Sequence, residues 1–124
     1  MDHPPDRTTS ARVIAAWQVT YSDPLTLRAG EEVTVGKHDT EWPGWVWCTN
    51  RTGKGGWVPE QYIEEHGSEG AARYDYTAVE LAVNVGDELL VGQRINGWAW
   101  CTNANGQSGW VPERNLEMIS TQPE

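Results

Sequence analysis

The sequence predicts an all-β protein made of two copies of one small module, and three observations lead to this prediction. Residues 44–60 recur as residues 97–113, with twelve of seventeen positions identical at a constant offset of 53. Short alternating segments separated by glycine-rich turns run through both halves, as strands require, and no amphipathic helix of useful length is found. Each half has roughly 50–60 residues, which is enough for a small domain to fold. A single larger sandwich gives no reason for near-identical halves.

Strands are expected in the same order in both copies. In the first copy they fall at residues 25–27, 33–35 and 45–49, followed by a short strand at 57–58. Each segment alternates or is rich in β-branched and aromatic residues. Pro59 ends the last of these strands, because proline cannot donate to a ladder of hydrogen bonds.

Small changes in the offset between the copies locate two loops. Trp17 aligns with Tyr74 at an offset of 57, and Leu25 aligns with Leu81 at an offset of 56. On this alignment the first copy carries one extra residue soon after Trp17 and three extra residues before Trp45. Insertions of this kind are tolerated in loops.

Composition predicts the boundaries of the modules. Residues 1–10 are polar with two prolines and are expected to form a disordered tail. The two modules then span 11–65 and 71–119, joined by a short flexible linker at 66–70, which is rich in glycine and charge. Residues 120–124 are expected to form a second loose end.

Both copies resemble the Src homology 3 (SH3) family. Residues 72–76 read Ala-Arg-Tyr-Asp-Tyr and resemble the family's opening Ala-Leu-Tyr-Asp-Tyr motif. Residues 80–83 and 86–89 resemble its Glu-Leu-Ser-Phe and Gly-Asp stretches. Residues 109–112 resemble the closing Gly-aromatic-aliphatic-Pro motif, and residues 59–63 the Pro-x-x-Tyr-Val ending. The resemblance implies two tandem five-stranded SH3-like β-barrels that bind proteins and are not enzymes.

The resemblance also implies a ligand and the residues that contact it. The family holds an extended, often proline-rich peptide of another protein on an aromatic surface, and such a peptide loses little entropy on binding. The residues that match this surface are Trp17, Trp45, Trp57, Pro59 and Tyr62 in the first copy, and Tyr74, Tyr76, Trp98, Trp110 and Pro112 in the second.

Each copy departs from the family at one wall of this surface. On the alignment above, Val19 stands where the second copy has Tyr76, and Asn115 stands where the first copy has Tyr62. The loop at residues 77–80 is also shorter than is usual in the family. Both copies are therefore expected to have incomplete or divergent binding surfaces.

Strand alternation predicts which side chains point into the barrels. On the strand at 45–49, Val46 and Cys48 share one face and Trp45 and Trp47 the other. The smaller pair suits a tight interior, so the tryptophans are expected outside. Cys48 and its counterpart Cys101 are then buried free thiols.

The chain has eight tryptophans and no phenylalanine, which is more tryptophan than two small cores need. Trp42, Trp47 and Trp100 are candidates for an additional ligand contact or for packing between modules. A second hypothesis is therefore a structural protein whose aromatic faces pack between modules or in a homodimer. A third is a module that binds bacterial cell-wall peptides.

Charge and residue types exclude several other functions. Nine basic and eighteen acidic side chains give a net charge of −9, which disfavours nucleic acid and anionic membranes as partners. A basic or neutral partner is favoured. No catalytic triad, phosphate-binding loop, metal-ligand cluster or cofactor motif is found, and His3, His38 and His66 are expected to be solvated. The first residues lack the pattern of a secretory signal, so a cytoplasmic location is expected.

Overall fold

The computed structural model describes residues 9–120, which form strands and two short 3-10 turns. The strands of the first half are β1 (Thr9–Val13), β2 (Thr26–Leu27), β3 (Glu32–His38), β4 (Trp45–Thr49), β5 (Gly55–Pro59) and β6 (Ile63–His66). Those of the second half are β7 (Glu69–Ala72), β8 (Tyr76–Thr77), β9 (Glu88–Ile95), β10 (Trp98–Thr102), β11 (Ser108–Pro112) and β12 (Leu116–Ser120). The 3-10 turns are η1 (Glu60–Tyr62) and η2 (Glu113–Asn115). Within these residues no helix has the length and hydropathy needed to span a membrane.

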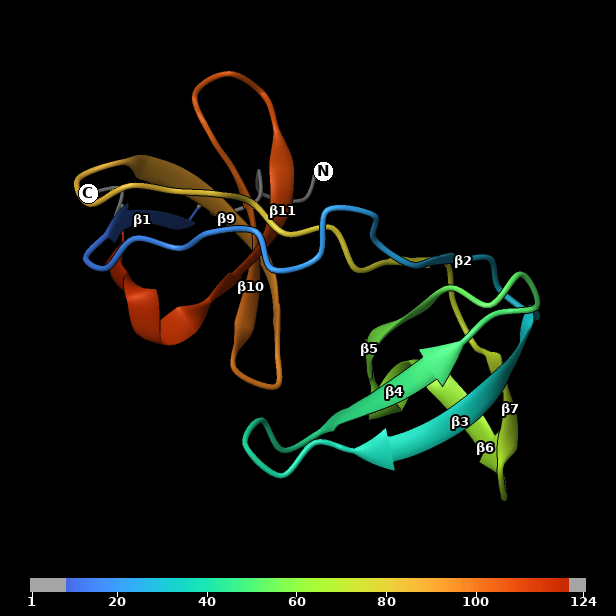
Figure 1. Ribbon diagram of the computed structural model, residues 1–124. Coiled ribbons are helices and arrows are strands. Elements are labelled where there is room, and N and C mark those ends of the chain that lie inside the picture. Colours follow the sequence, from blue (N-terminus) through green and yellow to red (C-terminus); the bar gives the residue numbers. More distant parts are fainter. Residues whose placement is uncertain (1–8, 121–124) are drawn as a thin grey trace, which may run out of the picture. The chain divides into compact units, whose positions relative to one another are not determined.

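Each of the two five-stranded sheets contains one strand from the other repeat. Their strand orders are β5-β4-β3-β7-β6 and β11-β10-β9-β1-β12, and β2 pairs with β8 separately. The dark-blue β1 therefore belongs with the orange and red strands of the second half, and the yellow-green β7 belongs beside the teal β3 (Figure 1). The all-β prediction with five-stranded units is confirmed, but the two repeats have exchanged their first strands.

The exchange changes the domain boundaries. One compact unit is the continuous segment Tyr21–Val79, which we call the insert. The other is formed by the chain before and after it, and we call its described residues, 9–20 and 80–120, the host. The insert thus interrupts the host in the loop after its first strand. The expected modules 11–65 and 71–119 do not coincide with these compact units.

A two-residue turn at the expected linker explains the exchange. Strands β6 and β7 pair antiparallel with His66 opposite Glu69, which leaves only Gly67 and Ser68 in the loop. Gly67 has a φ of 65°, the positive value that the first position of such a hairpin requires. Two strands joined in this way must be neighbours, so β7 completes the sheet of the first repeat. The expected flexible linker at 66–70 is therefore wrong.

The opening arms of the two repeats are exchanged in the same way. Tyr76 pairs with Leu27 of the first repeat, and Trp17 forms the equivalent bridge to Val83 of the second. Because Leu27 matches Val83 at an offset of 56, Trp17 is the structural counterpart of Tyr76. The sequence alignment of Trp17 with Tyr74 was wrong by two residues. Short connecting loops such as 77–80 promote exchange, because they cannot easily fold back on themselves.

The expected tails are partly ordered. Thr9 and Ser10 belong to β1 and pair with Ser120 and Ile119 of β12. The remaining residues of both predicted tails, 1–8 and 121–124, lie outside the described residues.

Each unit has its own apolar core that includes the exchanged strand. Ala11 and Val13 of β1 are buried in the host core, and Ala72 of β7 is buried in the insert. Burial of a valine side chain contributes on the order of 1.5–3 kcal/mol, so the exchanged strands stabilise the sheets that receive them. Val46 and Cys48 point inward as predicted.

Candidate functional site

Three tyrosines of the insert form an aromatic group that we call the tyrosine cluster. Tyr62 ends η1, Tyr76 is the first residue of β8, and Tyr74 lies two residues before that strand. The ring centroid of Tyr62 is 5.3 Å from that of Tyr74 and 5.5 Å from that of Tyr76, with the rings edge to face. Tyr74 is 56% exposed. The first repeat contributes one tyrosine and the second repeat two.

Hydrogen bonds hold the tyrosine cluster in place. The hydroxyl of Tyr76 donates to the carbonyl of Trp57 at 2.8 Å, and the Tyr76 ring is only 7% exposed. The amide of Arg73 donates to the carbonyl of Tyr62 at 2.7 Å, which ties the segment before Tyr74 to the end of η1. A surface fixed in this way loses little entropy when a ligand binds.

Trp45 and Pro59 lie opposite each other in the pairing of β4 with β5, on the approach to η1. Contrary to the alternation argument, Trp45 is only 5% exposed. Trp45 begins its strand, and the pairing of β3 with β4 shifts register between Val35 and His38, before their ends. Simple alternation does not determine exposure at such a position. Both residues lie in the sequence run that leads to Tyr62, but they are buried.

The host has different residues at the positions of the tyrosine cluster. The amide of Ile14 donates to the carbonyl of Asn115, as that of Arg73 does to Tyr62 in the insert. Ala15 therefore takes the place of Tyr74, and Asn115 that of Tyr62. Trp17, rather than the predicted Val19, takes the place of Tyr76.

Trp17 is engaged within the host. Its ring packs edge to face on Trp98, with centroids 5.3 Å apart. Its Nε1–H donates to Oε1 of Glu80 at 2.9 Å, and the same oxygen accepts the amide of Thr20 at 3.0 Å. Pro112, the counterpart of Pro59, lies opposite Trp98 in the strand pairing and is fully buried.

Four of the remaining tryptophans pack in two cross-strand pairs. Trp47 lies opposite Trp57 with ring centroids 5.1 Å apart, and Trp100 lies opposite Trp110 at 5.2 Å. The Trp47 ring also covers Gly55, where a Cβ atom would come within 2.5 Å of it. Each pair belongs to a single unit, so this packing needs no second module. Trp42 is half-buried in the loop before β4.

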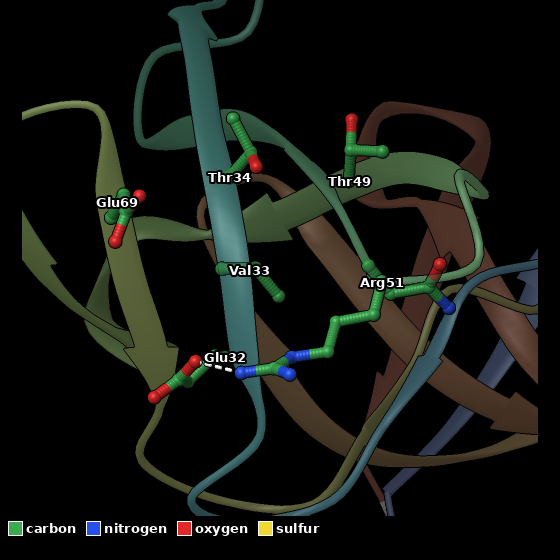
Figure 2. A pocket seen from close by; sticks show the side chains of 7 residues that line it. Glu32, Val33, Thr34, Thr49, Arg51 and Glu69 are labelled. Atoms are coloured by element: carbon green, nitrogen blue, oxygen red, sulfur yellow. Dashed lines mark hydrogen bonds and ion pairs between the residues drawn. The ribbon is translucent and has the colours of Figure 1, made fainter.

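The insert also has a polar depression on β3 and β4. It is lined by Glu32, Val33, Thr34, Thr49, Asn50, Arg51 and Glu69. Figure 2 shows the Arg51 side chain extending towards β3, where it forms an ion pair with Glu32. Both side chains are exposed, and such pairs contribute little energy. This depression has no aromatic surface.

A second depression lies next to the tyrosine cluster. It is lined by Thr26, Leu27, Arg28, Glu31, Asn50, Asp75, Tyr76 and Thr77. Its acidic groups are partly engaged, because Asp75 accepts the amide of Ala29 at 2.9 Å and Glu31 that of Arg28 at 3.0 Å. Tyr76 connects this polar region with the aromatic rings.

Among residues 9–120, the titratable side chains offer no strong nucleophile. Cys48 and Cys101 are free and buried, and burial raises the pKa of each thiol to about 11. They are therefore protonated and unreactive at neutral pH. Residues 9–120 contain no group of three His, Cys, Asp or Glu side chains that could hold a metal ion. His38 is exposed, but its Nδ1 lies 2.5 Å from Glu60, and this hydrogen bond raises its pKa.

The fold defines a protein built from two small β-barrel modules of the same strand order. A family model for the variant SH3 domain matches residues 11–66 and again residues 71–119. The chain therefore belongs to the SH3 family and carries two copies of its domain, as the resemblance predicted. SH3 domains are generally interaction modules without catalytic activity. No curated protein matches the chain.

Proposed function

We propose that this protein is a non-catalytic interaction protein that binds an extended, proline-rich segment of another protein at the tyrosine cluster of the insert. The observation that supports this best is the arrangement of Tyr74, which is 56% exposed yet packed against Tyr62. A ring that is both exposed and held in place can contact a ligand without first being ordered.

The chemistry of the surface suits this ligand. A polyproline helix has no internal hydrogen bonds and is already extended, so it binds aromatic surfaces at low entropic cost. The net charge of −9 favours a peptide that also carries basic residues.

The test is a proline-rich peptide array probed with the full chain and two variants. Tyr74→Ala removes an exposed ring, and we expect it to weaken binding by roughly 2 kcal/mol or more, as truncation of a central aromatic contact does. Tyr21→Ala is the matched control, because Tyr21 is also exposed but packs on Trp47. Equal binding by both variants and the parent would refute the proposal.

The alternative, an assembly protein whose aromatic faces pack together, has less support. Trp47 and Trp100 were its main candidates, and each packs on its cross-strand partner. The exposed apolar side chains of the host include Ile14, Val85 and Leu90, and isolated exposures of this kind are common in monomers. Sedimentation of the chain as a monomer would count against assembly.

A further inference from the structure

We infer that the protein is monovalent: its binding surface is completed by residues of both repeats, and Asn115 closes the corresponding face of the host. This inference rests on the proposed function and adds which residues of the binding surface each repeat supplies. A tandem repeat is otherwise expected to offer two equivalent sites.

The open surface is shared between the repeats. Tyr62 belongs to the first repeat, whereas Tyr74 and Tyr76 belong to the second, and the rings meet at 5.3 and 5.5 Å. Each repeat alone lacks part of this set, as the sequence showed. The exchange of arms collects all three tyrosines in the insert.

The same exchange places Ala15 and Trp17 at the host positions of Tyr74 and Tyr76, and Asn115 stands at the host position of Tyr62. Its side chain is only 7% exposed, and its Nδ2 group donates to the carbonyls of Ala15 and Ala16, both at 3.1 Å. Its own carbonyl accepts the amides of Ile14 at 2.8 Å and Ala15 at 3.3 Å. An amide group has two N–H donors, so the side chain has no further proton to offer.

A peptide group that took the place of the Asn115 side chain would have to break its two hydrogen bonds to the arm. The carbonyls of Ala15 and Ala16 would lose the side-chain donor that now satisfies them. The indole N–H of Trp17 is also engaged, by Glu80 at 2.9 Å. The side-chain N–H groups of Asn115 and the indole N–H of Trp17 are therefore engaged within the host itself.

Calorimetric titration of the full chain with a proline-rich peptide flanked by arginines tests the inference. We expect one peptide per chain, and a loss of affinity of more than tenfold in Tyr74→Ala. Two peptides per chain with equal affinity would overturn the inference while leaving the proposed function intact.

A gain-of-site variant gives a sharper test. Ala15→Tyr combined with Asn115→Tyr restores the two missing rings in the host, and we expect the stoichiometry to rise towards two. A folded double variant that still binds one peptide, at an unchanged affinity, would count against Asn115 as the closing residue. Far-ultraviolet circular dichroism reports whether the variant is folded.

A measurement without peptide separates this inference from the proposed function. The side-chain amide protons of Asn115 should exchange slowly with water in nuclear magnetic resonance spectra, because both are hydrogen-bonded and buried. The exposed amide of Gln18 is the control and should exchange rapidly. If the peptide binds neither the parent protein nor the double variant, the proposed function fails. Rapid exchange at Asn115 would overturn the closed face of the host, whatever the peptide result.

Discussion

The insert and the host have the same strand order but differ in how the chain forms them. The insert takes all its strands from one continuous run, Tyr21–Val79, whereas the host joins an arm at 9–20 to residues 80–120. Sequence repeats are therefore not the same as folding units in this chain. The unit that follows the chain without a break also carries the complete tyrosine cluster.

Connectivity makes the two units unequal in stability. To form the host, the chain must bring Thr20 and Glu80 together across the whole insert, and closing an unfolded loop of that length costs about 3–4 kcal/mol from its logarithmic dependence alone. A folded insert holds its own ends together, because β2 pairs with β8 and the amide of Ala78 donates to Leu25 at 2.9 Å. We therefore expect the host to depend on a folded insert, and the insert to fold without the host.

The largest expected effect comes from cutting the chain at the unit boundaries. A fragment of residues 21–79 should unfold cooperatively, since it retains each strand of its sheet. A fragment of residues 80–124 should be unfolded, because without β1 the buried faces of β9 and β12 are exposed. Thermal unfolding followed by tryptophan fluorescence checks both. If residues 11–65 unfold cooperatively and residues 21–79 do not, the repeats fold separately.

Engineered disulfides test the exchange in the intact chain. Arg12 pairs with Glu117, whereas Glu64 pairs with Ala71, the counterpart of Arg12. The pair Arg12→Cys with Glu117→Cys should therefore oxidise readily and stabilise the host by up to about 5 kcal/mol in the chain-entropy model. The control pair, Arg12→Cys with Glu64→Cys, should remain reduced.

The reverse pattern of oxidation would show that each repeat keeps its own first strand. Thiol counting under denaturing conditions measures the outcome. Cys48 and Cys101 add the same two thiols to every count, and they do not compete during oxidation because both are fully buried in the folded protein.

Cavity-forming substitutions at equivalent positions test whether the host depends on the insert more than the insert depends on the host. Val58 and Val111 match at an offset of 53 and are both fully buried. Replacing either by alanine should cost about 2 kcal/mol in its own unit. Val58→Ala should also destabilise the host, whereas Val111→Ala should leave the insert unchanged. Native-state hydrogen exchange resolves the two units, and equal effects in both directions would contradict the dependence.

The sequence predicted the fold class better than the connectivity, for a physical reason. Local alternation fixed the inward positions of Val46 and Cys48, which depend only on the strand that carries them. The turn at Gly67 and Ser68 was also visible in the sequence, since two residues of this type between strands indicate a hairpin. This turn was assigned to a linker because the glycines and charged residues at 66–70 are typical of flexible linkers.

The arrangement of the site could not be predicted in the same way. Tyr62, Tyr74 and Tyr76 were each identified as candidates, but they were divided between two surfaces. Asn115 bonds to Ala15, which is 100 residues away in the chain. Local patterns do not encode which repeat supplies an arm. The sequence therefore did not show that the aromatic residue missing from one repeat is supplied by the arm of the other.

The smallest expected effect is a pH dependence found in one unit only. His38 of the insert contacts Glu60, and the equivalent pair in the host is Arg94 with Glu113 at 3.6 Å. The hydrogen bond to Glu60 raises the pKa of His38 from its usual value of 6.5. Its stabilising contribution is therefore fully present below pH 6.5, while Glu60 stays ionised, and is lost as the pH rises through the raised pKa.

Because His38 and Glu60 are exposed, the loss should be below about 1 kcal/mol. Urea unfolding of the insert between mildly acidic and mildly alkaline pH measures it, and arginine keeps its charge across this range. His38→Arg should therefore abolish the pH dependence and make the insert behave like the host. A pH dependence that persists in this variant would show that another group causes the effect. His38 would then not explain a difference in pH dependence between the two units.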